Sequence, residues 1–142
     1  PDISANGLTA MGEALALVAD CAKRDVVKAS ATKKADWRHM VFLMTDGSPT
    51  DDIEKGIARF KEERWGAIVG CAVDGGDTDI LKRIAGEAVV RLDTSDSNAL
   101  AAFFKWVTAS ISTSSKSVQT TGKEVEGLSQ LPPPPPEIQV VV

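Results

Sequence analysis

The sequence predicts an α/β protein in which a parallel β-sheet carries helices on both faces. Two short, uninterrupted apolar runs, residues 40–44 and 67–73, are typical of strands that are buried on both sides. Segments with a helical spacing of apolar residues lie before, between and after these runs. This alternation of helices and strands is the pattern of a parallel sheet with crossover helices.

The first predicted helix covers residues 9–28. Its apolar stripe has members three or four positions apart, with further apolar neighbours that widen it: Met11, Ala14, Leu15, Leu17, Val18, Cys21 and Ala22. A polar, basic connector over residues 30–37 then leads into the strand at residues 40–44. We expect this strand to lie in the centre of the sheet.

The strand at residues 40–44 ends in an acidic turn with the sequence TDGSPTDD, residues 45–52. In parallel α/β sheets, ligands bind at the carboxyl ends of the strands. A carboxylate at this point can reach a cation or a phosphate. Asp46 is therefore the leading candidate for a functional residue.

The second predicted helix follows this turn and has its apolar face at Ile53, Ile57, Phe60 and Trp65. Thr50 or Asp51 can cap its first turn, and Gly66 ends it. Acidic residues in the first turn of a helix suit the helix dipole, so Asp51 and Asp52 are expected in this role before a role as metal ligands.

The remaining elements alternate in the same way. After the strand at residues 67–73, Asp77 or Thr78 caps a short helix that ends near Gly86. A third strand covers residues 89–92. The last helix has its predicted apolar face at Leu100, Phe103, Phe104, Val107 and Ile111.

The chain changes character beyond residue 112, so we expect a folded part over residues 1–112 and a tail over residues 113–142. The tail is rich in Ser and Thr, then contains five consecutive prolines at 132–136, and ends in residues that fit a short edge strand. The proline run has two interpretations: a stiff spacer that docks the tail on the body, or a ligand for a proline-recognising domain.

The composition excludes several classes of protein. The chain has 142 residues, 43% of them hydrophobic, and a net charge of −4 with acidic and basic residues interspersed, which is unlike a nucleic-acid-binding surface. No apolar run is long enough to span a bilayer. Cys21 and Cys71 form no C-x-x-C motif, so we expect reduced thiols in a cytoplasmic protein and no zinc. The chain starts without Met, and we expect it to be a fragment.

A second segment extends the interpretation of Asp46. Residues 8–15 (LTAMGEAL) place Thr9 at the start of the first helix, where a helix cap is the ordinary role. Together with TDGSPTD after the strand, this segment resembles the von Willebrand factor A family, a Rossmann-like fold, and its metal-ion-dependent adhesion site. Residues 37–52, 81–84 and 103–107 and the proline-rich end resemble the TerY-type group of bacterial tellurium-resistance proteins.

The resemblance implies a cation site built from three loops: Asp-x-Ser-x-Ser after the first strand, a Thr, and a later Asp. Thr9 matches the second loop and Asp46 the third. No Asp-x-Ser-x-Ser follows a suitable strand, because residues 93–97 (DTSDS) come after the wrong strand. We therefore expect the chain to be the C-terminal two-thirds of the domain, without its first strand and helix.

The implied function is a non-enzymatic, metal-dependent protein-interaction module in tellurite or stress resistance. The implied cation is Mg²⁺, or Mn²⁺ or Ca²⁺, held weakly without the missing loop. The implied partners are other proteins, of the tellurium-resistance system among others, which bind through an acidic side chain at the metal. We expect no nucleic acid, no membrane insertion, and self-association through the strand edge that the missing strand exposes.

Two alternatives remain open. A von Willebrand-type domain without a metal can act as a scaffold that binds partners through other surfaces. An Asp after an apolar strand also begins the chemistry of phosphohydrolases that form an aspartyl phosphate, but those enzymes need a second acid two residues later. That position is Ser48, which argues against an enzyme.

Overall fold

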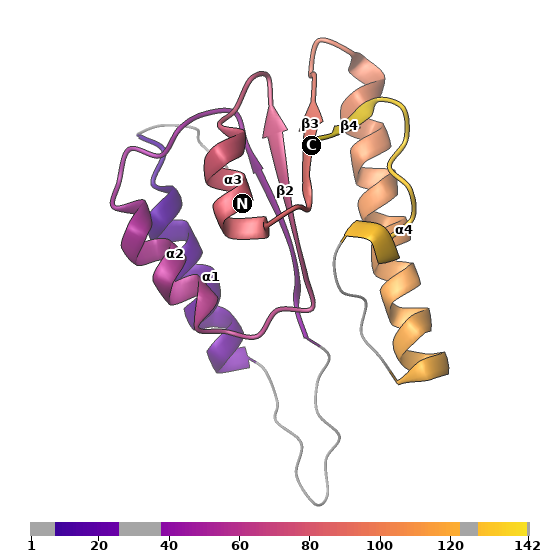
Figure 1. Cartoon of the computed structure of the whole chain (residues 1–142), viewed down its shortest axis with the longest axis horizontal. Helices are drawn as coiled ribbons and strands as arrows, with labels where there is room; N and C mark the ends of the chain where they lie inside the picture. The colour runs from indigo at the N-terminus through magenta and orange to yellow at the C-terminus, as the bar shows by residue number, and fades with distance from the viewer. Residues whose placement is uncertain (1–7, 26–37, 123–127, 142) are drawn as a thin grey trace, which may run out of the picture.

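A computed structural model of the chain describes residues 8–25, 38–122 and 128–141 (Figure 1). The elements in chain order are α1 (Met11–Asp25), β1 (Met40–Thr45), α2 (Ile53–Lys61), β2 (Ala67–Val73), α3 (Thr78–Ala85), β3 (Val89–Leu92), α4 (Ser97–Thr121), the 3₁₀ helix η1 (Leu128–Gln130) and β4 (Ile138–Val140). This order confirms the predicted alternation. The predicted end of the first helix at residue 28 and the connector 30–37 lie outside the described residues.

The four strands form one sheet in the order β1-β2-β3-β4. β1 pairs with β2, and β2 with β3, in parallel, whereas β4 runs antiparallel to β3. β4 contains Ile138, which lies opposite Leu92. The protein is therefore an α/β protein with a mostly parallel sheet, as predicted.

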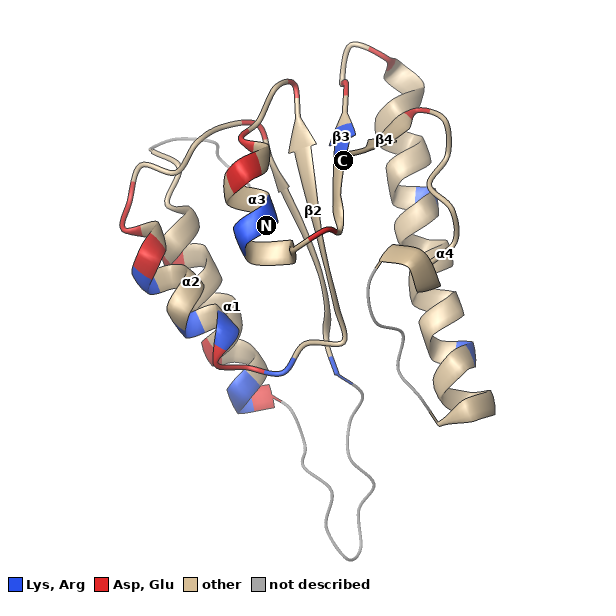
Figure 2. Cartoon of the chain, in the orientation of Figure 1, with Lys and Arg blue, Asp and Glu red and all other residues tan. Residues whose placement is uncertain are grey.

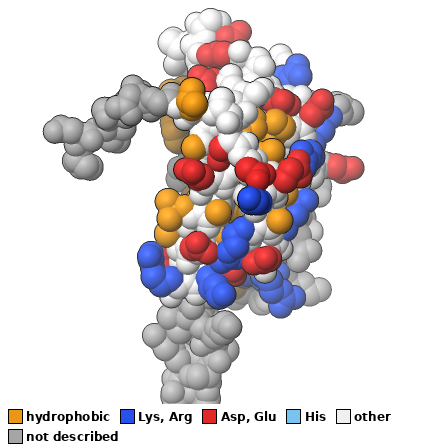
Figure 3. All heavy atoms as spheres, turned by 90° about the vertical axis from the view of Figure 1, so that its left-hand side faces the viewer, with side chains coloured by type: hydrophobic (Ala, Val, Ile, Leu, Met, Phe, Trp, Pro, Cys, Tyr) orange, Lys and Arg blue, Asp and Glu red, His pale blue; other side chains and the backbone are white. Residues whose placement is uncertain are grey.

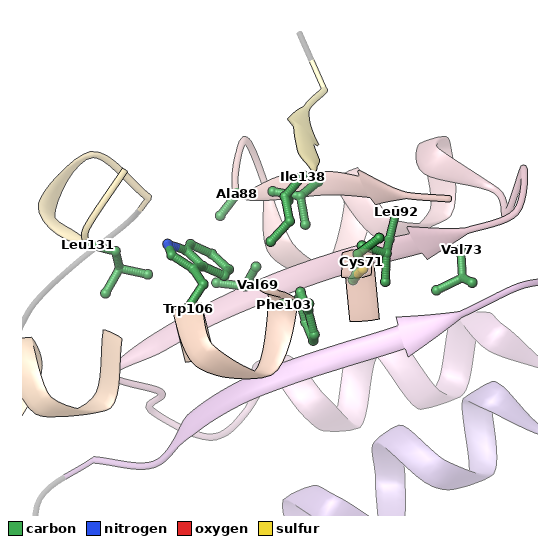
Figure 4. Close-up of a cluster of buried hydrophobic side chains, with 11 residues drawn as sticks. Val69, Cys71, Val73, Ala88, Leu92, Phe103, Trp106, Leu131 and Ile138 are labelled. Atoms are coloured by element: carbon green, nitrogen blue, oxygen red, sulfur yellow. The ribbon is translucent and has the colours of Figure 1, made fainter. Parts of the chain in front are cut away.

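Helices cover both faces of this sheet, because side chains along β2 alternate between two cores. Val69, Cys71 and Val73 pack with Phe103 and Trp106 of α4 in one buried cluster (Figure 4). On the other face, α1 and α2 share a cluster with Ile84 of α3. Burial raises the pKa of the Cys71 thiol to about 11, so this cysteine is an unreactive part of the core.

β1 is neither central nor fully buried, as its apolar run alone predicted, and it has the free edge that the resemblance to the family implied. It is the first strand of the sheet and is hydrogen-bonded on one side, to β2, among the described residues. Its side chains are half-buried, and Met44 is 36% exposed. A run of apolar residues indicates that the side chains prefer to be buried. It does not indicate how many strands pair with that segment.

Two predicted helix faces are also corrected. On α1, Leu17 and Val18 are 64% and 42% exposed. The buried face of α1 is narrower than predicted, and its apolar members are Met11, Leu15, Ala19 and Ala22. On α4, the exposed positions are Leu100, Phe104 and Ile111, and the buried ones are Ala99, Phe103, Trp106 and Ser110. In both helices, small residues occupy part of the buried stripe because they allow close packing.

α4 continues past the expected limit of the last helix at residue 112 and ends at Gly122, which has a positive φ of 68°. The chain then returns along α4 to β4 (Figure 1). Leu131 and Ile138 from this returning segment belong to the same core cluster as Trp106. The folded body therefore includes the segment that carries the five prolines.

The charged residues at the helix ends have the signs that suit the helix dipole (Figure 2). Asp52, Asp77 and Asp96 cap the amino ends of α2, α3 and α4, and basic residues lie in the last turns of α1, α2 and α3. Figure 3 shows acidic and basic side chains side by side on one flank of the molecule, with hydrophobic side chains between them. Within the described part of the chain, no helix is long and apolar enough to cross a membrane.

Candidate functional site

The turn after β1 is closed by its own side chains. The Thr45 hydroxyl donates to the carbonyl oxygen of Gly47 at 3.1 Å and accepts from the Gly47 amide at 3.3 Å. Asp46 lies between them, exposed at the carboxyl end of the strand. Its carboxylate makes no hydrogen bond or ion pair with the described residues, so it is available to a ligand.

Thr9 lies next to this turn. Its hydroxyl oxygen is 3.9 Å from the point that a Cβ atom on Gly47 would occupy. The carbonyl oxygen of Thr9 accepts from the Thr50 amide at 2.9 Å and from the Thr50 hydroxyl at 3.2 Å. The structure therefore places Thr9 beside Gly47, the residue that follows Asp46, although Thr9 and Asp46 are 37 positions apart in the chain.

Asp51 fixes α1 to the same loop. One oxygen of its carboxylate accepts from the Gly12 amide at 3.0 Å, and the other accepts from the Glu13 amide at 2.8 Å. These two amides belong to the first turn of α1, so Asp51 caps α1 from a distant part of the chain. Hydrogen bonds from Gly12 and then Glu13 hold the pKa of the Asp51 carboxyl below its ordinary value.

The expected cap of α2, Thr50 or Asp51, was wrong. The α2 cap is Asp52, whose side chain accepts from the Lys55 amide. The sequence alone carries no sign of the Asp51–α1 contact, because it joins segments 38 and 39 residues apart. A short acidic loop offers several carboxylates for one helix start, and tertiary packing decides between them.

Two glycines allow α1 and α2 to cross closely enough for these contacts. A Cβ on Gly56 of α2 would lie 2.3 Å from the carbonyl oxygen of Gly12 and 2.4 Å from its Cα. A Cβ on Gly12 would lie 2.5 Å from the carbonyl oxygen of Asp52. Arg59 of α2 also donates to Asp20 of α1 at 2.7 Å. The position of Thr9 therefore depends on backbone contact between the two helices.

Neighbouring acids at this end of the sheet are already engaged. Asp77 caps α3 through the amides of Asp79 and Ile80, and its other oxygen is 3.5 Å from the Ser48 hydroxyl. Asp74, which has a positive φ of 48°, accepts from the Thr94 amide at 2.8 Å and from the Thr94 hydroxyl. Both carboxylates therefore have structural roles in the loop that follows β2, where they contact the loops after β1 and β3.

The donor set fits part of a site for a hard cation. Thr9 offers a hydroxyl oxygen and Asp46 a carboxylate, and both are ligands that Mg²⁺ and Ca²⁺ accept. Within the described residues, no three acidic, His or Cys side chains form a metal-binding group. Thr9 and Asp46 would therefore supply only part of the coordination shell.

Comparison with known proteins identifies the family of the chain. A model of the von Willebrand factor type A domain matches residues 2–106, which span both halves of the candidate site. No curated protein and no solved structure is significantly similar to the chain. The match covers most of the sequence and agrees with the α/β fold, so the chain belongs to the von Willebrand factor type A domain family.

Proposed function

We propose that the protein is a protein-interaction module whose contact with its partner is a divalent cation held by Thr9 and Asp46. The observation that carries this proposal is the position of the Thr9 hydroxyl beside the turn that bears the exposed Asp46. Membership of the von Willebrand factor type A family supports a role in protein–protein interaction. Exposure of Asp46 at a strand end leaves room for a partner to approach.

The chemistry of the two side chains favours Mg²⁺, with Mn²⁺ and Ca²⁺ as alternatives. One carboxylate and one neutral hydroxyl leave a net positive charge on a bound divalent cation. Mg²⁺ keeps several waters and binds through one or two carboxylates, so an acidic side chain of a partner can replace a water. Thr9 and Asp46 would orient the cation, and the cation would supply the attraction for the partner's carboxylate.

The biological setting rests on the resemblance to the tellurium-resistance group. We place the module in the cytoplasm, in tellurite or general stress resistance, with partners among proteins of that system. Cys21 and Cys71 are both free thiols, which supports a reducing compartment. The role is non-enzymatic, because the position two residues after Asp46 is Ser48 and offers no general acid.

Capture of partners with and without Mg²⁺ tests the proposal. The full-length protein serves as bait, in Mg²⁺ or in a chelator, beside the variants Asp46→Asn and Thr9→Val. Asp79→Asn is the matched control, because Asp79 is an exposed acid at the same end of the sheet. We expect capture to require Mg²⁺, to be lost in the first two variants, and to persist in the control.

Capture that survives both the chelator and Asp46→Asn would instead favour a scaffold that needs no metal. Calorimetric titration of residues 1–142 should show Mg²⁺ binding no tighter than about 10⁻³ M, since two protein ligands make a weak site. Micromolar binding would contradict that expectation. Hydrolysis of an aryl phosphate that disappears in Asp46→Asn would favour the phosphohydrolase alternative.

The free edge of β1 supports a second contact, with another copy of the chain. Backbone groups on the outer side of β1 have no strand partner among the described residues, and the strand carries no charged side chain. Such an edge favours strand pairing between molecules. Sedimentation velocity should show association that weakens in Met44→Lys, and a chain that is monomeric at all concentrations would refute this contact.

A further inference from the structure

The five prolines lie in a segment that is anchored at both ends, which we call the proline strap (residues 131–138). At one end, Leu131 is 6% exposed and the Trp106 indole N–H donates to the carbonyl oxygen of Pro132 at 2.8 Å. At the other end, Ile138 is 4% exposed and begins β4, which pairs with β3. Figure 4 shows both anchors with Trp106 in one buried cluster.

The backbone of the proline strap is extended because of its sequence. Residues 131–135 each precede a proline, which disfavours the helical region and leaves the polyproline II conformation. Only the last turn departs from this path, where the Ile138 amide donates to the carbonyl oxygen of Pro135 at 2.9 Å. A polyproline II helix has three residues per turn, so residues three apart share one face.

The exposure of the prolines follows this period of three. Pro132 and Pro135 are half-buried, and Pro135 lies near Trp106 in the wall of a hollow over α4. Pro133 and Pro136 are exposed and form the outward face. The body therefore holds one face of the strap and turns another, with prolines at i and i+3, toward the solvent.

Open space lies on both sides of the strap. On one side, a hollow of about 780 Å³ is lined by Pro133 and Pro134 together with Trp65, Ile84 and Leu128. On the other side, a hollow of about 530 Å³ is lined by Pro135, Glu137 and residues of α4 that include Lys105. Residues of the strap thus line two hollows that are open to a partner.

We propose that the proline strap is a preformed ligand for a protein with an aromatic-lined groove that binds polyproline II helices. Pro133 and Pro136 have the P-x-x-P spacing that such grooves recognise. The anchors at Leu131 and Ile138 fix the ligand conformation before binding, which reduces the entropy lost on association. Glu137 is exposed beside this face and favours a basic residue at the matching end of the groove.

Direct binding to proline-recognising domains tests the proposal. The probes are isolated SH3, WW and EVH1 domains, titrated calorimetrically with the whole chain. The double variant Pro133→Ala/Pro136→Ala removes the outward face, and Pro132→Ala/Pro134→Ala is the matched control with the same loss of two prolines. We expect at least one domain to bind, the outward variant to lose about tenfold or more in affinity, and the control to lose much less.

A second variant tests the role of the anchors. Trp106→Phe keeps an aromatic ring in the core but removes the N–H that holds Pro132, so affinity should fall while Pro133 and Pro136 remain present. Circular dichroism and thermal melting of each variant establish that it is folded. Failure of every domain to bind the folded wild-type chain, or equal losses in the outward and control variants, would overturn the proposal.

Discussion

Replacing Gly56 with alanine tests the contact that holds α1 against α2 and Thr9 beside Asp46. An exposed or loosely packed glycine inside a helix costs about 1 kcal/mol relative to alanine, so this change ordinarily stabilises a helix. At Gly56 the new Cβ would lie 2.3 Å from the carbonyl oxygen of Gly12 and 2.4 Å from its Cα. Both neighbours are backbone atoms, so no side-chain rotation relieves the overlap.

The expected change in the free energy of unfolding is the difference between a steric cost and a gain in helix propensity. Ordinary contact requires the helices to separate by about 1 Å, and overpacking of this kind typically costs 1–3 kcal/mol. We use about 3 kcal/mol, the upper end, because the obstruction is backbone, and subtract about 1 kcal/mol for the better helix propensity of alanine. Gly56→Ala should therefore lower the free energy of unfolding by about 2 kcal/mol.

Urea unfolding followed by circular dichroism measures this change. Ala58→Gly is the control, because Ala58 is exposed on the same helix and reports the propensity difference without a steric effect. We expect Ala58→Gly to destabilise by about 1 kcal/mol. If Gly56→Ala is neutral or stabilising while the control behaves as expected, the helices do not pack through Gly12 and Gly56, and the placement of Thr9 loses its support.

Two further predictions concern single side chains. Ser110 is fully buried, and its hydroxyl has no hydrogen-bond partner among the residues that the structure describes. Ser110→Ala should therefore raise the free energy of unfolding by about 1 kcal/mol, measured in urea against the exposed control Ser112→Ala. The pKa of the Asp51 carboxyl is lower in the folded state than its ordinary value of 3.8. The ionised carboxylate therefore stabilises the fold at pH values above 3.8, and this stabilisation is lost as the pH falls through the lowered pKa of the folded state. Asp51→Asn should be less stable than the wild type at neutral pH, with a difference that shrinks below about pH 4, and a difference independent of pH would contradict the assigned hydrogen bonds.

The sequence predicts the order and type of the elements because local patterns carry that information. The run at residues 67–73 is a strand with alternating contacts on two faces, as predicted. The expected end of the preceding helix at Gly66 was wrong, because α2 ends at Lys61 with Glu62 as its cap, and Trp65 lies in the connection to β2. The position of a strand within a sheet is a different matter, since it depends on which other strands are present. For that reason the apolar run alone predicts a central position for β1, whereas the resemblance to the family implies the edge position that β1 has among the described residues.

For the candidate site too, local sequence patterns predict some features and miss those that depend on tertiary packing. Asp46 could be selected because it directly follows an apolar strand, whereas Thr9 by itself fits a helix cap and could be selected only through the resemblance of its segment to the family. The roles of Asp51 and Gly56 could not, because they are defined by the approach of α1 to α2 across about 40 residues of sequence. A glycine in a helix and an acid before a helix have ordinary local explanations, and only three-dimensional packing distinguishes the alternatives.

The return of the chain to β4 has a consequence for synthesis. β3 is the last strand of the parallel set, and its outer edge is covered by a strand that is made almost fifty residues later. Until residues 131–140 have been translated, the edge of β3 is unpaired and the Trp106 indole lacks Leu131, Ile138 and its hydrogen-bond acceptor. A nascent chain halted within α4 therefore exposes both a strand edge and part of its core, and is a target for chaperones and for aggregation.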